Sequence, residues 1–366
     1  MGEILEYEQP GPYIVDSTDY DNSYSTPVLT AGQSFILGYT NETAGIKKAT
    51  PDNPVIIFDD FTTSSHYVDF SFKVKSSAMK FLTLKNDTDD IYCINNVLEN
   101  IDYIPASHER HWISIFTNFD VRVPSSREEQ KSIGDYFRNL DTLIALHQRK
   151  CEQTKKMKKY MLQKMFPQNG AKVPEIRFDG FTYDWEQRKF SELYARSSEK
   201  NDGSIGMDKN ITVATMQFKN DVKVSTTEYL KTYYTFKLGD IAFEGHQSKE
   251  FRYGRFVEND IGNGIVSHIF AVFRPIQEYD LYFWKYAINN ETLMQRILAR
   301  STKASTMMHD LVTNDFLNET FLVPSVKEQK QIGAFLNKLD NLITLHQRKC
   351  DELKKMKKYM LQNMFI

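Results

Sequence analysis

The chain has 366 residues, of which 41% are hydrophobic and 26% are charged, and its formal net charge is −2. This length is sufficient for two ordinary domains with cores of their own, and the composition is that of a globular protein. Proteins that hold nucleic acid by themselves are normally more basic, so the charge argues against an independent nucleic-acid binder.

Membrane-spanning and disulfide-stabilised proteins are also disfavoured. No apolar run reaches the length of about 18 residues that indicates a membrane span. The first residues, MGEILEYEQPG, are too polar for a signal peptide. The three cysteines do not form a disulfide framework, since Cys151 and Cys350 are counterparts in a repeat and Cys93 stands alone. We therefore expect a cytoplasmic protein with reduced thiols.

The charge is unevenly distributed along the chain. Residues 1–120 hold 7 Lys and Arg against 18 Asp and Glu, residues 121–176 hold 12 against 6, and residues 177–366 hold 27 against 24. Two interpretations stay open. Either the chain does not bind nucleic acid, or a partner supplies many of the phosphate contacts.

The first region has the pattern of a mixed α/β domain. Asn53–Phe61 (NPVIIFDDF) and Tyr67–Val74 (YVDFSFKV) have the Val, Ile and Phe content and the alternation of strands. We expect both to be β-strands.

A long helix follows, and a capping box marks its start. Ser126 and Glu129 have the spacing at which the serine hydroxyl accepts from the third helical amide and the glutamate bonds back to the serine amide. Pro167 predicts the end of the helix. Asn139–Asp141 favours a bend or a break, because Asp can cap a new start. The stretch Asp141–Met165 alone would be about 37 Å long.

The second region also reads as mixed α/β. Strands are expected at Gly239–Gly245, Arg252–Asp260 and Gly264–Pro275, with a turn at Gly262–Gly264 between the last two. The apolar spacing of Asp280–Ser301 predicts one helix.

The long helix is then repeated. Glu328–Phe365 is identical to Glu129–Phe166 at 26 of 38 positions, and Ser325 with Glu328 repeats the capping box. Spacings of three and four residues predict a coiled-coil seam. The seam positions are Leu140, Ile144, His147, Cys151 and Met161 in the first copy and Leu339, Ile343, His346, Cys350, Leu353 and Met360 in the second.

Some residues of the repeat have more than one interpretation. Lys158 and Lys357 fall on the seam and make it imperfect. His147 and His346 are expected to pack or hydrogen-bond between helices rather than to bind metal. The motif KKMKKYM, present in both copies, is a solvated helix face, a partner-docking face or, less favoured, a DNA phosphate contact.

The sequence has no catalytic signature. Asn53-Pro54-Val55-Ile56 lacks the second proline and the aromatic residue of an amino-methyltransferase loop. A phosphate loop, a Cys/His zinc spacing and a nucleophile elbow are absent from the sequence. We therefore expect a chain that is itself non-catalytic, without a metal or cofactor, and we assign any chemistry to a partner.

Two stretches resemble the specificity (S) subunits of type I restriction–modification enzymes. The first is the helix with its lead-in, from VPSSREEQKSIG to KKMKKYMLQKMF, together with its second copy. The second is Val173–Leu193 (VPEIRFDGFTYDWEQRKFSEL), which resembles the stretch that opens a target recognition domain in that family. Together they cover roughly a third of the chain.

The resemblance implies an α+β fold with two globular α/β target recognition domains. An antiparallel pair of long conserved helices, a coiled coil, would separate them with approximate two-fold internal symmetry. The implied segments are a first recognition domain at 1–123, a first helical region at 124–172, a second recognition domain with its entry linker at 173–323, and a second helical region at 324–366.

The resemblance also implies a function. Each recognition domain would read one half of a bipartite site in double-stranded DNA. Each domain with its helix would recruit one methyltransferase (M) subunit, which uses S-adenosylmethionine to methylate adenine at N6. Restriction (R) subunits would join to cleave unmodified DNA. The helix would be repeated because two copies of one partner dock on it.

Candidate DNA-contacting residues are polar or basic side chains in expected loops, since these match the hydrogen-bonding patterns of base edges. In the first region they are Lys47, Lys48, Ser65, His66, Arg110 and His111. In the second region they are Gln217, Lys219, Gln247, Lys249, Arg252, Arg255, Thr302 and Lys303. The flanking Ser64, His108, His246, Ser248 and Ser301 belong to the same clusters.

Two points stay open at the level of sequence. A scaffold whose two modules bind protein or glycan, joined by a coiled coil, is the alternative, and the acidic first region supports it. The linker has no counterpart before the first module, where MGEILEY lies level with Phe190–Tyr194. Family members often carry a copy there, which leaves the entry strand of the first domain unassigned.

Overall fold

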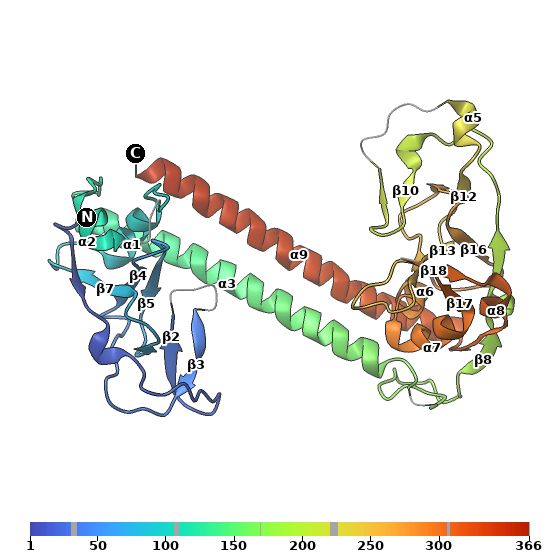
Figure 1. Ribbon diagram of the computed structural model, residues 1–366, viewed down its shortest axis with the longest axis horizontal. Helices are drawn as coiled ribbons and strands as arrows, with labels where there is room; N and C mark the ends of the chain where they lie inside the picture. The colour runs from blue at the N-terminus through green and yellow to red at the C-terminus, as the bar shows by residue number, and fades with distance from the viewer. Residues whose placement is uncertain (31–34, 106–109, 169, 220–225, 306–307, 366) are drawn as a thin grey trace. The chain divides into compact units, whose positions relative to one another are not determined.

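A computed structural model describes residues 1–30, 35–105, 110–168, 170–219, 226–305 and 308–365. The chain forms two compact units (Figure 1). Unit 1 consists of Met1–Arg149 with Gln347–Ile366, and unit 2 is Lys150–His346. The two long helices, α3 (Arg127–Lys164) and α9 (Val326–Met364), each contribute one end to each unit.

Unit 1 contains a four-stranded antiparallel sheet in the order β1-β7-β4-β5. Its strands are β1 (Leu5–Glu8), β7 (Met79–Leu84), β4 (Val55–Asp59) and β5 (Ser65–Val68). All five residues of β4 are buried, which fits its central position and its apolar sequence. A smaller sheet consists of β3 (Ile36–Thr40), β2 (Thr26–Leu29) and β6 (Lys73–Val74), and the short helices are α1 (Ile91–Glu99) and α2 (His111–Ser114).

Unit 2 contains a sheet of the same plan, in the order β9-β16-β13-β14. Its strands are β9 (Tyr194–Ser197), β16 (Ala271–Pro275), β13 (Ile241–Glu244) and β14 (Arg255–Glu258). In each sheet the first strand of the domain lies at one edge and pairs with the strand that precedes the domain's main helix. The predicted alignment of the chain start with Phe190–Tyr194 is therefore confirmed, because β1 and β9 occupy the same place.

Further elements of unit 2 form two-stranded ribbons and helices. The ribbons pair β10 (Ile211–Thr212) with β11 (Gln217–Phe218), β12 (Tyr234–Phe236) with β15 (Gly264–Val266), β17 (Thr302–Ala304) with β18 (His309–Leu311), and β19 (Thr320–Val323) with β8 (Glu186–Lys189). The helices are α4 (Phe190–Leu193), α5 (Thr227–Leu230), α6 (Leu281–Ile288), α7 (Glu291–Ser301) and α8 (Thr313–Asn318).

Three expected elements are each divided in two. Tyr67–Val74 belongs to β5 and β6, which lie in different sheets. Gly264–Pro275 forms β15 and β16, separated by a turn in which the Phe270 amide donates to the Ser267 carbonyl. Asp280–Ser301 forms α6 and α7, because the Asn290 side chain accepts from the Thr292 amide and caps a new helix.

The starts of the long helices confirm one half of each expected capping box. Ser126 Oγ accepts from the Glu129 amide at 3.4 Å, and Ser325 Oγ accepts from the Glu328 amide at 3.3 Å. The other half is wrong at Glu328, whose carboxylate instead accepts from Arg177 and from the Trp185 indole. The expected break at Asn139–Asp141 is also wrong, because α3 runs through it uninterrupted.

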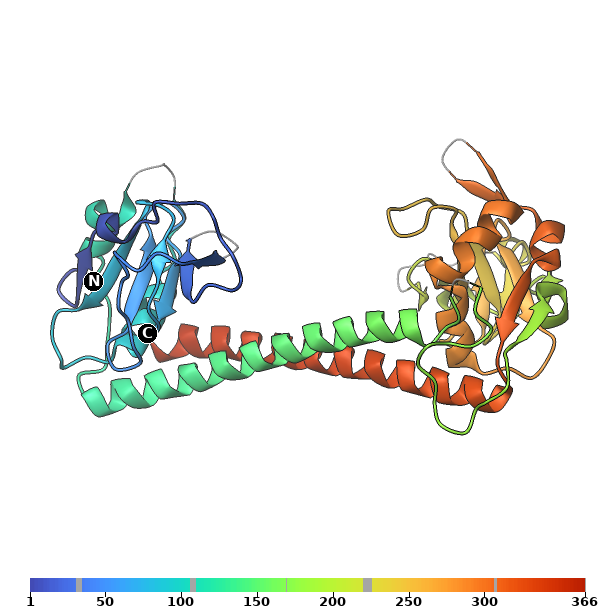
Figure 2. The same cartoon turned by 90° about the horizontal axis from the view of Figure 1, so that it is seen from below.

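Within each unit the two long helices run antiparallel. In unit 1, Phe137 of α3 stacks on Phe365, just after the end of α9. One turn further along α3, Asp141 pairs with Lys357, which lies about two turns before Phe365 in the chain. Figure 2 shows the red end of α9 beside the teal start of α3. In unit 2, Cys151 Sγ of α3 lies 3.9 Å from the Ile343 carbonyl of α9. Lys158, two turns further along α3, pairs with Asp340, about one turn earlier in α9. The expected antiparallel packing is therefore present in both units.

The residues of the expected seam are buried or partly buried. The buried side chains are Leu140, Ile144, Cys151, Leu339, Cys350 and Leu353. The partly buried ones are His147, Met161, Ile343, His346 and Met360. Lys158 and Lys357 do not interrupt this packing, since each reaches an aspartate of the opposite helix.

Each domain is seated on its long helix by the same contacts. The Asp90 side chain caps α1 and the Asp280 side chain caps α6. Both aspartates face a glycine of the long helix, where a Cβ on Gly134 or Gly333 would lie 2.3 Å or 2.2 Å from the aspartate Oδ1. The aspartate amides donate to Gln130 and Gln329 respectively.

A tyrosine, an aspartate and a lysine complete this seat in each unit, and we call them the docking triads. In unit 1, Tyr92 donates to Asp141 at 2.7 Å and Lys357 approaches the same carboxylate to 2.9 Å. In unit 2, Tyr286 donates to Asp340 at 2.6 Å, and Lys158 pairs with it at 2.6 Å. Burial and the aspartate raise the pKa of both tyrosines.

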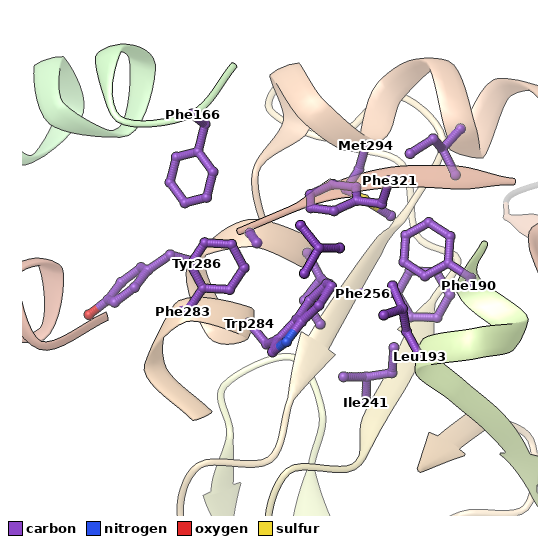
Figure 3. Close-up of a cluster of buried hydrophobic side chains, with 14 of the residues drawn as sticks. Phe166, Phe190, Leu193, Ile241, Phe256, Phe283, Trp284, Tyr286, Met294 and Phe321 are labelled. Carbon is purple, nitrogen blue, oxygen red and sulfur yellow. The ribbon is translucent and has the colours of Figure 1, made fainter. Parts of the chain in front are cut away.

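The largest core lies in unit 2 and joins the end of α3 to the sheet (Figure 3). Phe166, just after α3, points toward Phe283 of α6, with ring centroids 5.6 Å apart. Trp284 of α6 packs edge-on against Tyr194 of β9. Aromatic contacts of this kind anchor the sheet of unit 2 to the end of the long helix.

A buried acid lies beside this core. Glu258 of β14 is 3% exposed, and neither of its carboxyl oxygens has a hydrogen-bond partner among the described residues. Burial, with the nearby charges of Asp260 and Asp280, raises its pKa well above the usual range, while Lys285 opposes the shift. The folded unit therefore keeps Glu258 protonated to a higher pH than the unfolded chain does.

Glu258→Gln should stabilise the protein at pH 7 to 8 and leave it nearly unchanged at pH 4. The unfolded carboxyl ionises near its ordinary pKa whereas the folded one stays protonated, so wild-type stability falls as pH rises above about 4.5. Thermal unfolding of both proteins across this range measures the difference. The exposed Glu278→Gln is the control, and parallel pH profiles for wild type and Glu258→Gln would contradict the assignment.

Candidate nucleic-acid interface

The turn between β4 and β5 of unit 1 carries one predicted cluster, TTSSHY. Asp59 Oδ1 accepts from the amides of Phe61 and Thr62, and Thr63 adopts a left-handed conformation with φ of 58°. These bonds tighten the chain reversal and present Ser64 and Ser65 at its exit.

The segment at 110–112 lies against this turn. The His111 amide donates to the Asp60 carbonyl at 3.2 Å, and the Trp112 amide donates to Asp60 Oδ1 at 3.0 Å. Asp60 also forms an ion pair with Lys80 at 2.8 Å, and both side chains are almost completely buried. Asp60 therefore fastens two segments that are distant in sequence to the end of the central strand.

Unit 2 has the same arrangement at the end of β13. The loop 245–254 occupies the place of the β4–β5 turn, and the His309 amide donates to the Gly245 carbonyl at 2.8 Å. A Cβ on Gly245 would lie 2.2 Å from the His309 carbonyl oxygen, so only glycine permits this approach. The hairpin β17–β18, drawn in orange in Figure 2, is thereby held beside the loop.

A third segment joins this surface in unit 2. Arg255, at the start of β14, donates to Glu244 at 2.7 Å and to the Ala214 carbonyl at 2.8 Å. Ala214 lies in the turn between β10 and β11, and β11 leads to Gln217 and Lys219. The predicted clusters QFK, GHQSKEFRYGR and STK of unit 2 are thus brought together by the Gly245–His309 backbone bond and by the Arg255 side chain.

The sequence-derived candidates differ in exposure. Exposed are Lys48, Arg110, Gln217, Lys219, Gln247, Lys249, Arg252 and Lys303. Partly buried are Lys47, Ser65, His66, Arg255 and Thr302. Among the flanking residues His246 and Ser248 are exposed, Ser64 is partly buried and Ser301 is buried, while His108 lies outside the described residues.

Three candidates need correction. His111 is fully buried and its Nδ1 bonds the Asp60 carbonyl at 2.7 Å, so its side chain belongs to the domain core. Lys47 pairs with Glu8 and lies over the Tyr13 ring. Arg255 is held by Glu244. The side chains of Lys47 and Arg255 are 16% and 24% exposed, so neither is free to turn toward a ligand.

His66 is partly buried and stays a candidate for contact with a base. Its ring lies 4.4 Å from that of Phe35, and burial lowers the pKa of the imidazole, although Glu99 and Asp59 oppose the shift. A neutral imidazole can still donate and accept at a base edge.

Lys80 and Asp60 are the residues that the sequence did not reveal. Lys80 lies within an apolar strand, MKFLTL, where a charged residue requires a buried partner. This single lysine in an otherwise apolar strand was the available signal, but nothing in the sequence pointed to Asp60 as its partner.

Two equivalent cavities lie beside the docking triads. In unit 1 a cavity of about 690 Å³ is lined by Lys354, Lys357, Lys358 and Leu361 of α9 and by the end of α1. In unit 2 a cavity of about 490 Å³ is lined by Lys155, Lys158, Lys159 and Leu162 of α3 and by residues that follow α6. The three lysines and the leucine of one cavity are the repeat counterparts of those in the other. We call these the lysine cavities.

Metal-binding clusters and membrane-spanning helices are two further features that the described residues can reveal. Over the described ranges, no group of three or more His, Cys, Asp or Glu side chains is placed to hold a metal ion. Within the same ranges, no helix is both long enough and apolar enough to cross a membrane.

Lys80→Met should destabilise unit 1 by about 3–5 kcal/mol, because it leaves the Asp60 carboxylate buried without its partner. Adding Asp60→Asn should recover most of this loss, since Asn keeps the oxygen that accepts from Trp112 and removes the charge. Hydrogen exchange through a urea titration would measure both variants, with unit 2 as the internal reference. Unchanged protection in Lys80→Met alone would contradict this role.

Comparison with known proteins places this fold in one family. The family model described as type I restriction modification DNA specificity domain matches residues 1–156 and 183–355. The specificity subunit of the type I restriction enzyme EcoR124I/EcoR124II from Escherichia coli is 45% identical over 153 residues, covering 40% of this chain. That match spans only 37% of the E. coli protein.

Two more distant relatives agree over most of the chain. The specificity subunit of the type I restriction enzyme MjaVIII from Methanocaldococcus jannaschii is 23% identical over 312 residues, covering 79% of this chain and 72% of that protein. The crystal structure of the S subunit of a type I restriction–modification system from M. genitalium superimposes with a TM-score of 0.69. It covers 100% of this chain and 94% of that one at 13% identity, which shows the fold alone. Because the family model matches most of its length, the chain belongs to the type I restriction–modification DNA specificity family.

Proposed function

We propose that this chain is the specificity subunit of a type I restriction–modification complex and reads a bipartite site in double-stranded DNA, one half-site with each unit. The observation that carries the proposal is the equivalence of the two candidate surfaces. In both units a loop at the end of the central strand meets a later segment of the domain, through the Asp60–His111 bond and the Gly245–His309 bond. Equivalent surfaces with unrelated side chains are suited to reading two different half-sites.

The exposed side chains support base recognition in unit 2. Gln247, Lys249 and Arg252 lie on one loop, with Lys303 on the adjoining hairpin. Arg and Lys pair with guanine and Gln pairs with adenine in the major groove. Unit 1 offers fewer basic groups, mainly Lys48 and Arg110. We therefore assign much of the phosphate binding around the first half-site to partner subunits.

The lysine cavities support docking of two methyltransferase subunits, one in each unit. In each cavity one lysine is tied to an aspartate, Lys357 to Asp141 and Lys158 to Asp340. The other two lysines of each cavity are exposed and its leucine is partly buried. This combination suits a segment that carries acidic and apolar residues. Because the helix residues that line the two cavities are equivalent, the same segment of two identical subunits could occupy both cavities.

Chemistry in this proposal belongs to the partners. The methyltransferase subunits would bind S-adenosylmethionine and methylate adenine, and restriction subunits would add DNA cleavage. This chain would supply sequence recognition and the two docking faces, in the cytoplasm where the DNA is.

Footprinting of the purified complex with its methyltransferase should reveal two short protected blocks around an unprotected gap. The combined variant Gln247→Ala, Lys249→Ala and Arg252→Ala should lose one block and keep the other, because all three side chains lie on one loop of unit 2. Lys189→Ala, exposed on β8, is the matched control. A complex that retains no DNA at low salt would remove this function and favour a protein- or glycan-binding scaffold.

Charge reversal should remove the methyltransferase subunits one at a time. Lys354→Glu with Lys358→Glu should lower the number bound from two to one, as should Lys155→Glu with Lys159→Glu, and the four changes together should abolish binding. Lys156→Glu with Lys355→Glu is the control, since these lysines are exposed on the same helices outside the cavities. Native mass measurement counts the subunits, and two bound to every variant would disprove docking at these sites.

A further inference from the structure

We infer that Arg255 is a positioning residue that holds three separate segments of unit 2 as one reading surface and thereby determines the base preference of one half-site. The inference rests on the proposed function. It departs from the expectation drawn from the sequence, in which Arg255 contacts DNA directly.

Two nitrogens of the Arg255 guanidinium donate hydrogen bonds within the protein. Nε donates to Glu244 Oε2 at 2.7 Å, and Nη2 donates to the Ala214 carbonyl at 2.8 Å. The planar group also lies over the Phe251 ring, 5.1 Å from its centroid. Glu244 is the cross-strand partner of Arg255, and its side chain is 14% exposed. A charged pair of this geometry is well fixed, because a fork of donors has fewer alternatives than a single ammonium.

The contacts of Arg255 reach different segments of the chain, each of which carries candidate base-contacting residues. Ala214 belongs to the β10–β11 turn that leads to Gln217. Phe251 closes the loop 245–254, where its carbonyl accepts from the Ser248 amide and its amide donates to Ser248 Oγ. This closed turn places Lys249 between its two ends. Arg255 therefore fixes the β10–β11 ribbon relative to the loop.

The same loop is tied on its other side to the hairpin β17–β18. Gly245 bonds His309, and the Tyr253 ring packs edge-on against the His309 ring at 5.4 Å. The Arg252 amide donates to Glu291 of α7. The loop is thus held from the hairpin side by backbone contacts and from the ribbon side by Arg255. Recognition of several adjacent bases requires that the side chains stay at fixed distances from one another. Loss of one of these contacts should therefore weaken the discrimination between bases in this half-site.

Arg255→Lys and Arg255→Gln test the inference in the full chain with its methyltransferase. A lysine can reach Glu244 but cannot hold Glu244 and Ala214 in one plane. For both variants we expect discrimination between correct and incorrect bases in one half-site to fall about tenfold, the scale of one lost base contact. The other half-site and the spacing should not change. Sequencing of methylated sites measures the preference of each position.

The salt dependence of DNA binding separates positioning from direct contact. A residue that neutralises one phosphate contributes about 0.9 to the slope of log affinity against log salt concentration. We expect an unchanged slope for both Arg255 variants. A slope reduced by about this amount, with unchanged base preference, would show a phosphate contact and overturn the inference.

A second variant and a control protect the test against misfolding. Glu244→Gln keeps the shape of the pair, weakens its charge and should relax the same half-site to a smaller extent. Arg188→Gln changes an arginine of β8 that pairs with Glu192 and should leave both half-sites unchanged. Unaltered preference in all Arg255 and Glu244 variants would overturn the positioning role. If wild type itself modifies no bipartite site, the proposed function fails instead.

Discussion

The structure depends on a carboxylate that is shared between a domain and two helices. Asp141 accepts the Tyr92 hydroxyl of its domain and pairs with Lys357 of the opposite helix, and Asp340 does the same with Tyr286 and Lys158. Burial disfavours the charged form of Lys357, but Glu99 and Asp141 outweigh this effect and raise its pKa. The pair lies in a partly buried site, where removal of either partner leaves an uncompensated charge.

This shared carboxylate explains why the helix is repeated so closely. Each unit needs the aspartate of one copy and the lysine of the other, so both copies must keep both residues. The docking glycine and glutamine, Gly134 with Gln130 and their counterparts Gly333 with Gln329, add the same requirement. Apolar side chains alone would allow the helices to slide by a turn, whereas a paired charge fixes the register. Residues that appeared to be flaws in the seam are therefore the ones that align it.

Prediction from sequence succeeded where the signal was local and periodic. The capping serines, the two long helices and the strands β4, β13 and β14 all follow from short patterns, whereas the antiparallel direction of the helices came from the family resemblance. Errors arose where tertiary context decides. Asn290 could cap a helix or continue one, and only the packing of α7 shows that it caps. The Glu328 carboxylate could bond its own serine, but Arg177, 151 residues earlier, provides a charged partner. Asp60 and Lys80 meet only because β4 and β7 are adjacent in the sheet.

For the candidate surfaces, the sequence supplied the loops and the structure separates the roles of their residues. His111, Lys80 and Arg255 are polar residues that would rank as DNA contacts by type, yet each is bound to the protein beside the loops. Gln247, Lys249 and Arg252 are polar residues of the same kind but are exposed to solvent, and amino-acid composition cannot reveal this difference. A recognition domain needs both classes, because a side chain selects a base only when its backbone is held in place. The fixed residues bind to the ends of β4 and β13, at Asp60 and Glu244, and these two strands have the same place in their sheets. Half-site preference can therefore change through the exposed residues while the scaffold that presents them is retained.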